Sequence, residues 1–233
     1  LILDLRYNGG GRVSSATAMA SMITGSYTGE IFAKKQWNED YQNYFLANEP
    51  DELFNYFVDK IQGGTDINKL NLSSLYVIGT SSTASASELV INGLKPYIDV
   101  YLIGNTTTGK SQASVTLYDS PNFGRTNANP DHKYAIQPLV YESVNANDIV
   151  VPYDGIEPDV EIEESLSNYG VLGDPSEPML AAAINAITGK TSKIQTRTIQ
   201  KEFNYQEFAE SASLKPNYKR MYIDELPSLN LRN

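Results

Sequence analysis

Two side chains that could react with each other follow neighbouring predicted strands. Residues 75–79 predict a strand, residues 86–95 a helix and residues 100–104 a second strand. Strands joined through a helix at this spacing form a βαβ unit, in which they are buried and parallel and the crossover is right-handed. Ser85 lies in the turn after the first strand and Lys110 in the turn after the second. Because α/β sheets usually place their chemistry at the carboxyl ends of strands, we expect Ser85 and Lys110 at one edge of the sheet.

Ser85 has a structural interpretation and a catalytic one. With Glu88 three residues later, it matches the capping box that begins many helices. The same position is beside unpaired N–H groups and the positive end of the helix dipole, which could hold an oxyanion. A neutral serine is a weak nucleophile and needs a base. Lys110 is the candidate base, and it could act only if burial lowered its pKa, since a free lysine is protonated at neutral pH.

The turn that carries Lys110 also matches a nucleotide-binding motif. Residues 104–111 fit the P-loop pattern G-x-x-x-x-G-K-[ST]. A P-loop is followed by a helix whose N-terminus binds phosphates, whereas residues 112–118 alternate between polar and apolar and predict a strand. A P-loop nucleotide hydrolase is therefore the less favoured alternative.

Four segments together resemble the C-terminal processing peptidases, also called tail-specific proteases. They are DLRYNGGG at residues 4–11, TASASE at 83–88, TTTGK at 106–110 and GIEPDV at 155–160. Members of that family are serine peptidases with a Ser–Lys dyad on a ClpP/crotonase-like α/β fold. The resemblance covers roughly residues 1–189.

The resemblance implies a role for five residues. Ser85 would be the nucleophile and Lys110 the general base, and the oxyanion would be held by amides of Ala86 and of Gly9 or Gly10. The implied function is hydrolysis of polypeptide bonds through an acyl-enzyme on Ser85, without a cofactor. The resemblance also implies residence in the periplasm or cell envelope.

Two features depart from the family pattern. The glutamine expected four residues after the lysine is Ser114 here, while Gln112 lies two residues after it, so both are possible third partners of the dyad. The PDZ domain that many members use to bind substrate tails is absent from this chain. A catalytically silent member that binds peptides or partner proteins through the same cleft is therefore an alternative.

Composition excludes several other functions. A net charge of −10 argues against nucleic acid as a partner, because phosphate binding needs clustered Lys and Arg. The apolar runs are too short for a membrane span. With no cysteine and one histidine, His132 in a loop-like stretch, a metal site is not expected. Nothing in the sequence indicates an oligomeric state.

The chain divides into a predicted catalytic core at residues 1–189, with a β-rich C-terminal part, and an extension at 190–233 packed on that core. A segment at about 25–74 is either a lid over the cleft or an ordinary surface excursion. Because the chain begins inside a predicted buried strand, we expect an upstream portion in the natural protein. The remaining expected helices cover residues 13–23, 51–62 and 178–188. The remaining expected strands cover 31–38, 113–118, 134–144, 149–151 and 221–224.

Overall fold

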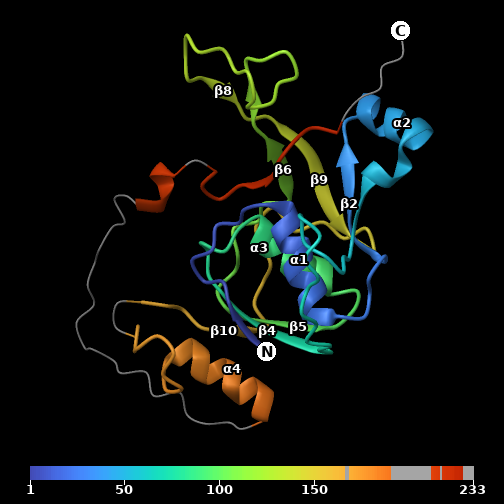
Figure 1. The fold of residues 1–233 in the computed structure, drawn as a ribbon. Coiled ribbons are helices and arrows are strands. Elements are labelled where there is room, and N and C mark those ends of the chain that lie inside the picture. The colour runs from blue at the N-terminus through green and yellow to red at the C-terminus, as the bar shows by residue number, and fades with distance from the viewer. Residues whose placement is uncertain (166–167, 190–210, 216, 228–233) are drawn as a thin grey trace.

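A computed structural model describes residues 1–165, 168–189, 211–215 and 217–227. Its first sheet is wholly parallel, with its strands in the order β1-β4-β5-β10 (Figure 1). Helix α3 (Ala86–Leu94) connects β4 to β5, so the predicted βαβ unit is confirmed. The strands of this sheet are β1 (Ile2–Asp4), β4 (Ser74–Gly79), β5 (Asp99–Gly104) and β10 (Val160–Glu161).

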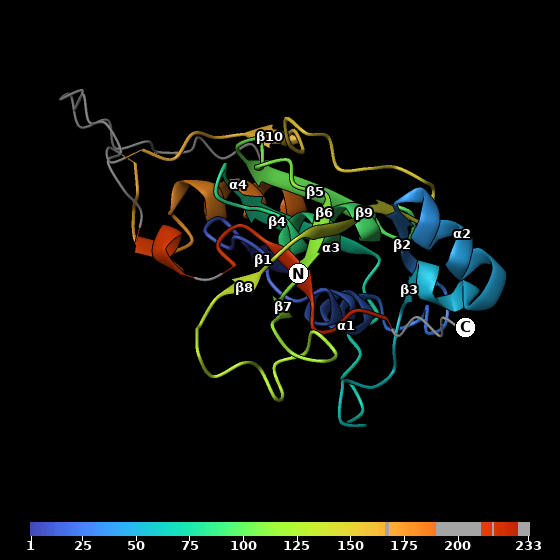
Figure 2. The same cartoon turned by 90° about the horizontal axis from the view of Figure 1, so that it is seen from above.

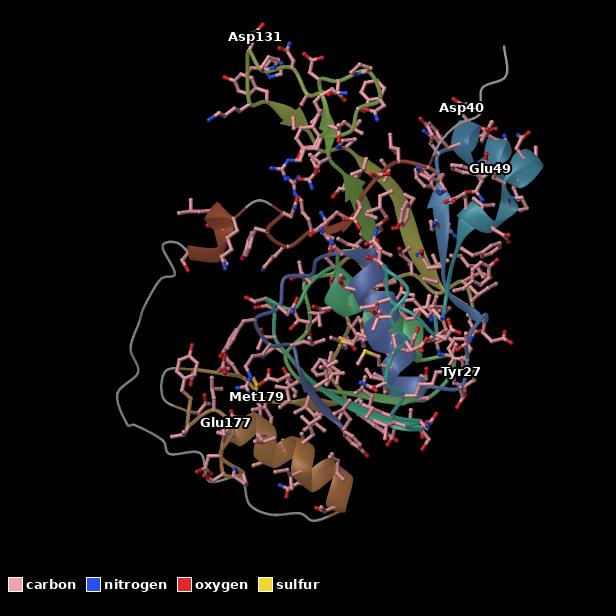
Figure 3. The ribbon with its side chains drawn as sticks, viewed as in Figure 1. Tyr27, Asp40, Glu49, Asp131, Glu177 and Met179 are labelled. Atoms are coloured by element: carbon pink, nitrogen blue, oxygen red, sulfur yellow. The ribbon has the colours of Figure 1, made fainter. Side chains whose placement is uncertain are left out.

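Helices cover both faces of this parallel sheet. Val77 and Leu102 belong to the main core, to which α1 (Val13–Thr24) and α3 also contribute. The next residues of the same two strands, Ile78 and Ile103, pack on the opposite face against Met179 of α4 (Pro178–Thr188). Figure 3 shows Glu177 and Met179 at the start of α4, facing the sheet. This alternation explains why β4 and β5 read as continuous apolar runs.

A second, mixed sheet packs on the other side of α3, with its strands in the order β11-β6-β9-β2-β3. The contact is close, since a Cβ added at Gly93 of α3 would lie 2.4 Å from the ring of Phe32. Only the pairing of β11 with β6 is parallel. The strands are β2 (Ile31–Trp37), β3 (Phe54–Tyr56), β6 (Gln112–Val115), β9 (Leu139–Asn145) and β11 (Met221–Ile223).

A hairpin of β7 (Leu117–Tyr118) and β8 (Ala135–Ile136) projects from the end of this second sheet. Figure 3 shows Asp131 at its tip. His132 lies in the same loop, 3.2 Å from Asp119 and away from the elements that carry Ser85 and Lys110. Within the described part of the chain, no helix is long and apolar enough to cross a membrane.

The predicted α/β fold class is confirmed, and so are the expected helices at 13–23 and 178–188 and the strands at 31–38 and 221–224. The helix expected at 51–62 is wrong. A short 3-10 turn, η1 (Pro50–Leu53), leads instead into β3, whose pairing with β2 overrides the helical spacing of the apolar residues. A helix, α2 (Glu39–Asn48), lies just before it, where none was predicted.

Two expected strands are interrupted. The strand at 113–118 breaks at Thr116 into β6 and β7, and the strand at 134–144 breaks into β8 and β9 at Gln137 and Pro138. Proline has no N–H to donate to a sheet, which accounts for the second break. The expected strand at 149–151 is reduced to an isolated bridge between Val150 and Val144.

Candidate active site

Ser85 has a strained backbone and an unused hydroxyl. Its φ of 64° and ψ of −114° are unusual for a residue with a side chain, and such a conformation costs about 1–3 kcal/mol. The residue is fully buried, and its side chain faces the Glu88 N–H in a capping-box arrangement, but its Oγ makes no hydrogen bond with a described residue. A buried hydroxyl without a partner costs roughly 1–3 kcal/mol more. Strain and an unpaired polar group at one residue are typical of functional sites.

The carboxylate of Glu88 joins the turn of Ser85 to the turn of Lys110. One oxygen, Oε2, accepts from the backbone N–H of Ser85 at 2.6 Å and from that of Lys110 at 2.9 Å. The other, Oε1, accepts from Thr107 Oγ1 at 2.5 Å and from Gly109 N–H at 2.6 Å. The backbone nitrogens of Ser85 and Lys110 therefore lie within two hydrogen-bond lengths of each other. The sequence indicated only the bond between Glu88 and Ser85, as part of the capping box.

The same arrangement argues against the P-loop alternative. The turn at residues 104–111 runs into strand β6, and no helix follows it. Its amides at Gly109 and Lys110 already donate to the Glu88 carboxylate, which would repel a phosphate. The turn therefore lacks both the helix N-terminus and the free amides that bind nucleotides.

Lys110 carries an amine whose environment favours the neutral form. The side chain is partly buried, and this burial lowers the pKa of Lys110, with a further lowering from the positive charge of Arg220. Across the described residues, no carboxylate or hydrogen-bond acceptor is paired with the amine. Glu88 is occupied by its four donors, and Asp99 begins β5 at the end of the strand away from Lys110. Neither carboxylate therefore holds the amine in its charged form.

A glycine turn packs directly against Ser85. Gly10 has a φ of +104°, and a Cβ at this position would lie 2.8 Å from the Cβ of Ser85 and 3.0 Å from the backbone nitrogen of Ala86. Only glycine meets both requirements. Ala86 is the first residue of α3, so its N–H has no acceptor within the helix. Gly9 lies in the same turn, against the backbone of Lys219.

Asn8 holds the glycine turn in place, a role that the sequence analysis missed. Its backbone carbonyl accepts from Ala84 N–H at 3.1 Å and from Ser87 Oγ at 3.0 Å. Its side-chain oxygen accepts from the Gly10 N–H at 3.0 Å, so this amide is engaged in the structure. An asparagine before consecutive glycines favours such a turn and could have been recognised.

Gln112 and Ser114, the possible third partners, bond elsewhere. The Gln112 amide donates to Ser111 Oγ at 3.0 Å and to Glu142 Oε1 at 3.3 Å. Ser114 Oγ donates to the carbonyl of Met221 at 3.0 Å. Neither contacts the Lys110 amine.

The segment at 155–160 is hydrogen-bonded to the turn that carries Lys110. The Thr107 N–H donates to the Ile156 carbonyl at 3.1 Å, and the Ile156 N–H donates to Thr107 Oγ1 at 2.8 Å. Gly109 faces the carbonyl of Tyr153 so closely that a Cβ would lie 2.2 Å from it. The fourth segment of the sequence resemblance thus lies beside the second and third.

A serine at the head of a buried helix, a glycine turn against it and a lysine of lowered pKa on the next turn have the composition of a serine hydrolase site. The chain belongs to peptidase family S41, whose family model matches residues 1–162. This family consists of serine peptidases, and the family recognised from the four segments is confirmed.

Many solved structures are similar to this chain, among them these two. A protein of Bacteroides fragilis NCTC 9343 assigned to the S41 proteases has 28% identity and a TM-score of 0.64, over 82% of this chain and 45% of its own. The photosystem II D1 C-terminal processing protease has 18% identity and a TM-score of 0.48, over 85% of this chain and 40% of its own. The chain thus spans less than half the length of either protein. No curated protein matches it.

Proposed function

We propose that the chain is the catalytic part of a serine endopeptidase in which Ser85 is the nucleophile and Lys110 the general base. The observation that carries the proposal is the Ser85 hydroxyl, which is buried, strained and unpaired within the described residues. A purely structural serine at a helix start would hydrogen-bond its hydroxyl to an N–H group of the first turn, whereas Ser85 has the capping-box arrangement without that hydrogen bond. Keeping the hydroxyl unpaired destabilises the fold and leaves it available for reaction.

The proposed reaction gives each of these groups one step. Ser85 Oγ attacks the scissile carbonyl carbon while the neutral Lys110 amine takes its proton. The N–H of Ala86 and an amide of Gly9 or Gly10 donate to the oxyanion. If Gly10 is the donor, its N–H exchanges the Asn8 side chain for the oxyanion. Collapse breaks the C–N bond, and Lys110 returns the proton to the leaving amine.

The second half of the reaction uses the same groups. Lys110 removes a proton from water, which attacks the carbonyl carbon of the Ser85 ester. The ester C–O bond then breaks, the peptide leaves as its acid, and Lys110 returns the proton to Ser85 Oγ. Each half begins with uncharged Lys110. Because the pKa of Lys110 is lowered by burial and by Arg220, a larger fraction of the enzyme is active at a given pH. The rate should rise with pH until Lys110 is fully neutral.

A serine-directed fluorophosphonate probe tests the proposal. We expect the native chain to be labelled, Ser85→Ala to show no labelling, and Lys110→Ala to label at least about 10²-fold more slowly. Lys60→Ala, at a lysine in an exposed ion pair with Asp66, is the matched control and should label like the native chain. Ser85→Ala should keep or raise the melting temperature, because it removes an unpaired buried hydroxyl.

Absence of labelling of the folded native chain would refute the proposal. It would favour the second candidate, a silent member that binds peptides at the same site. The bonding of Gln112 and Ser114 away from Lys110 is the observation in favour of that candidate.

From the family resemblance alone, we propose that the protein acts on polypeptides in the periplasm or cell envelope. Fractionation of cells that express the full-length protein tests the location. Recovery in the cytoplasmic fraction would refute it.

A further inference from the structure

Residues 217–224, here called the C-terminal strap, lie against the proposed active site. The strap contains β11, the red strand that runs beside β6 in both ribbon views (Figures 1 and 2). It is anchored by Met221, which is buried in the main core. It is hydrogen-bonded to β6, the strand that begins two residues after Lys110.

The strap also holds the glycine turn. The N–H of Tyr222 donates to the Gly11 carbonyl at 3.1 Å. A Cβ at Gly9 would lie 3.2 Å from the backbone nitrogen of Lys219, so the strap backbone packs directly on this glycine. Next to the turn, Arg12 and Asp224 form an ion pair at 3.1 Å. The turn therefore has Ser85 on one side, at Gly10, and the strap at Gly9.

Lys219 extends this contact to the nucleophile turn. Its Nζ donates to the carbonyl of Ser81 at 3.1 Å. The same carbonyl accepts from Thr108 Oγ1, on the turn of Lys110, at 2.7 Å. The strap, the serine turn and the lysine turn thus meet at a single oxygen atom.

Strand β11 is parallel to β6, with Met221 opposite Ala113, so Arg220 lies at the level of Gln112, two residues from Lys110. The strap therefore brings a positive charge to the start of β6. Arg220 Nη1 donates to Gln137 Oε1, which fixes the direction of the guanidinium. Two carboxylates lie on the other elements around the lysine turn. Glu88 of α3 is occupied by four donors, and Oε1 of Glu142 on β9 accepts from three side chains, those of Ser111, Gln112 and Tyr153. The charge of Arg220 is therefore not offset by an acid paired with the Lys110 amine.

We infer that Arg220 and Lys219 of the strap are positioning residues of the peptidase site: Arg220 holds a positive charge beside the lysine turn, and Lys219 fixes the glycine turn beside the serine turn. The inference rests on the proposed function. It assigns a role in catalysis to residues outside the stretch 1–162 that the family model matches.

The pH–rate profile of peptide hydrolysis tests Arg220. We expect Arg220→Gln to move the acid limb to higher pH and to leave the limiting rate at alkaline pH unchanged, because only the neutral fraction of Lys110 changes. Arg220→Lys keeps the charge and should restore the native profile. Gln137→Ala removes the hydrogen bond but not the charge, and it should leave the acid limb in place. A profile for Arg220→Gln that coincides with the native one would overturn the role of Arg220.

The turnover number at alkaline pH tests Lys219. Lys219→Met keeps most of the side-chain volume and removes the bond to Ser81. It should lower kcat by about tenfold to a hundredfold, the usual effect of misplacing a catalytic group. Lys215→Met, at an exposed lysine just before the strap, is the control and should match the native enzyme.

Thermal unfolding of each variant shows whether it is folded. A rise in kcat for Lys219→Met would overturn the inference, since it would mean that the strap obstructs the site. If the native chain itself neither labels with fluorophosphonate nor hydrolyses peptide, the proposed function fails. If the native chain is active and the strap variants match it, only the inference fails.

Discussion

Replacing Glu88 with glutamine should loosen Ser85 and Lys110 together. The Glu88 side chain is fully buried, and each of its oxygens accepts two hydrogen bonds. Glutamine has the same shape but only one acceptor oxygen. If the NH2 group takes the place of Oε2, it faces the amides of Ser85 and Lys110; if it takes the place of Oε1, it faces the amide of Gly109, while the Thr107 hydroxyl can turn to accept. At least one donor therefore loses its partner, and the remaining bonds lose the charge of the carboxylate.

The size of the effect follows from the bonds that are lost or weakened. A hydrogen bond to a charged group contributes about 1.5–3 kcal/mol, so Glu88→Gln should lower the free energy of unfolding by roughly 3–6 kcal/mol. For a chain of this size, each kcal/mol lowers the melting temperature by about 2–4 °C. We therefore expect a decrease of about 6–24 °C. Fluorophosphonate labelling should slow as well, because the carboxylate sets the distance between the two turns.

Thermal unfolding at fixed protein concentration, followed by circular dichroism, measures the decrease in melting temperature. Glu39→Gln is the matched control, since Glu39 is also an acid in the first turn of a helix but is exposed on α2. It should cost at most about 1 kcal/mol, the usual contribution of such a charge to the helix dipole. If Glu88→Gln melts within a degree or two of Glu39→Gln, the four contacts do not hold the site, and the reasoning is wrong.

Three further predictions concern the turn, the core and the base. Gly10→Ala should abolish labelling and melt below Gly64→Ala, because both positions have positive φ but only Gly10 lacks space for a Cβ. Arg6→Ala should lower the free energy of unfolding, measured by urea titration, by about 3–5 kcal/mol, because it leaves three carboxylates around a buried position without their cation. The control Lys60→Ala, which removes an exposed ion pair, should cost at most about 1 kcal/mol. The native kcat should rise with pH as Lys110 loses its proton, and a kcat that falls over that range would exclude a lysine base.

The part of the site that depends on local sequence could be predicted. Apolar runs bounded by turns indicate β4, α3 and β5, and the parallel pairing of the two strands brings Ser85 and Lys110 to one sheet edge. Glu88 at the third helical position was recognisable as a cap. Its second role, on the lysine turn, depends on a contact across 22 residues and has no local signal.

Contacts between distant segments account for what the sequence did not reveal. The apolar residues of 51–62 recur at helical spacing, yet residues 54–56 form β3 because β2 offers an edge for pairing. The strand at 221–224 was recognisable, but its partner β6 and its place beside the glycine turn were not. The charge of Arg220 near Lys110 follows from that pairing and was therefore also missed.

The helix that begins after Ser85 has all nine of its residues buried. Most surface helices keep one face in water and can fray while the rest of the domain stays folded. Helix α3 has no such face, because one sheet packs on each side of it. Its amides should therefore exchange with deuterium only when the whole domain opens, and the catalytic geometry should be lost in the same cooperative event as the fold.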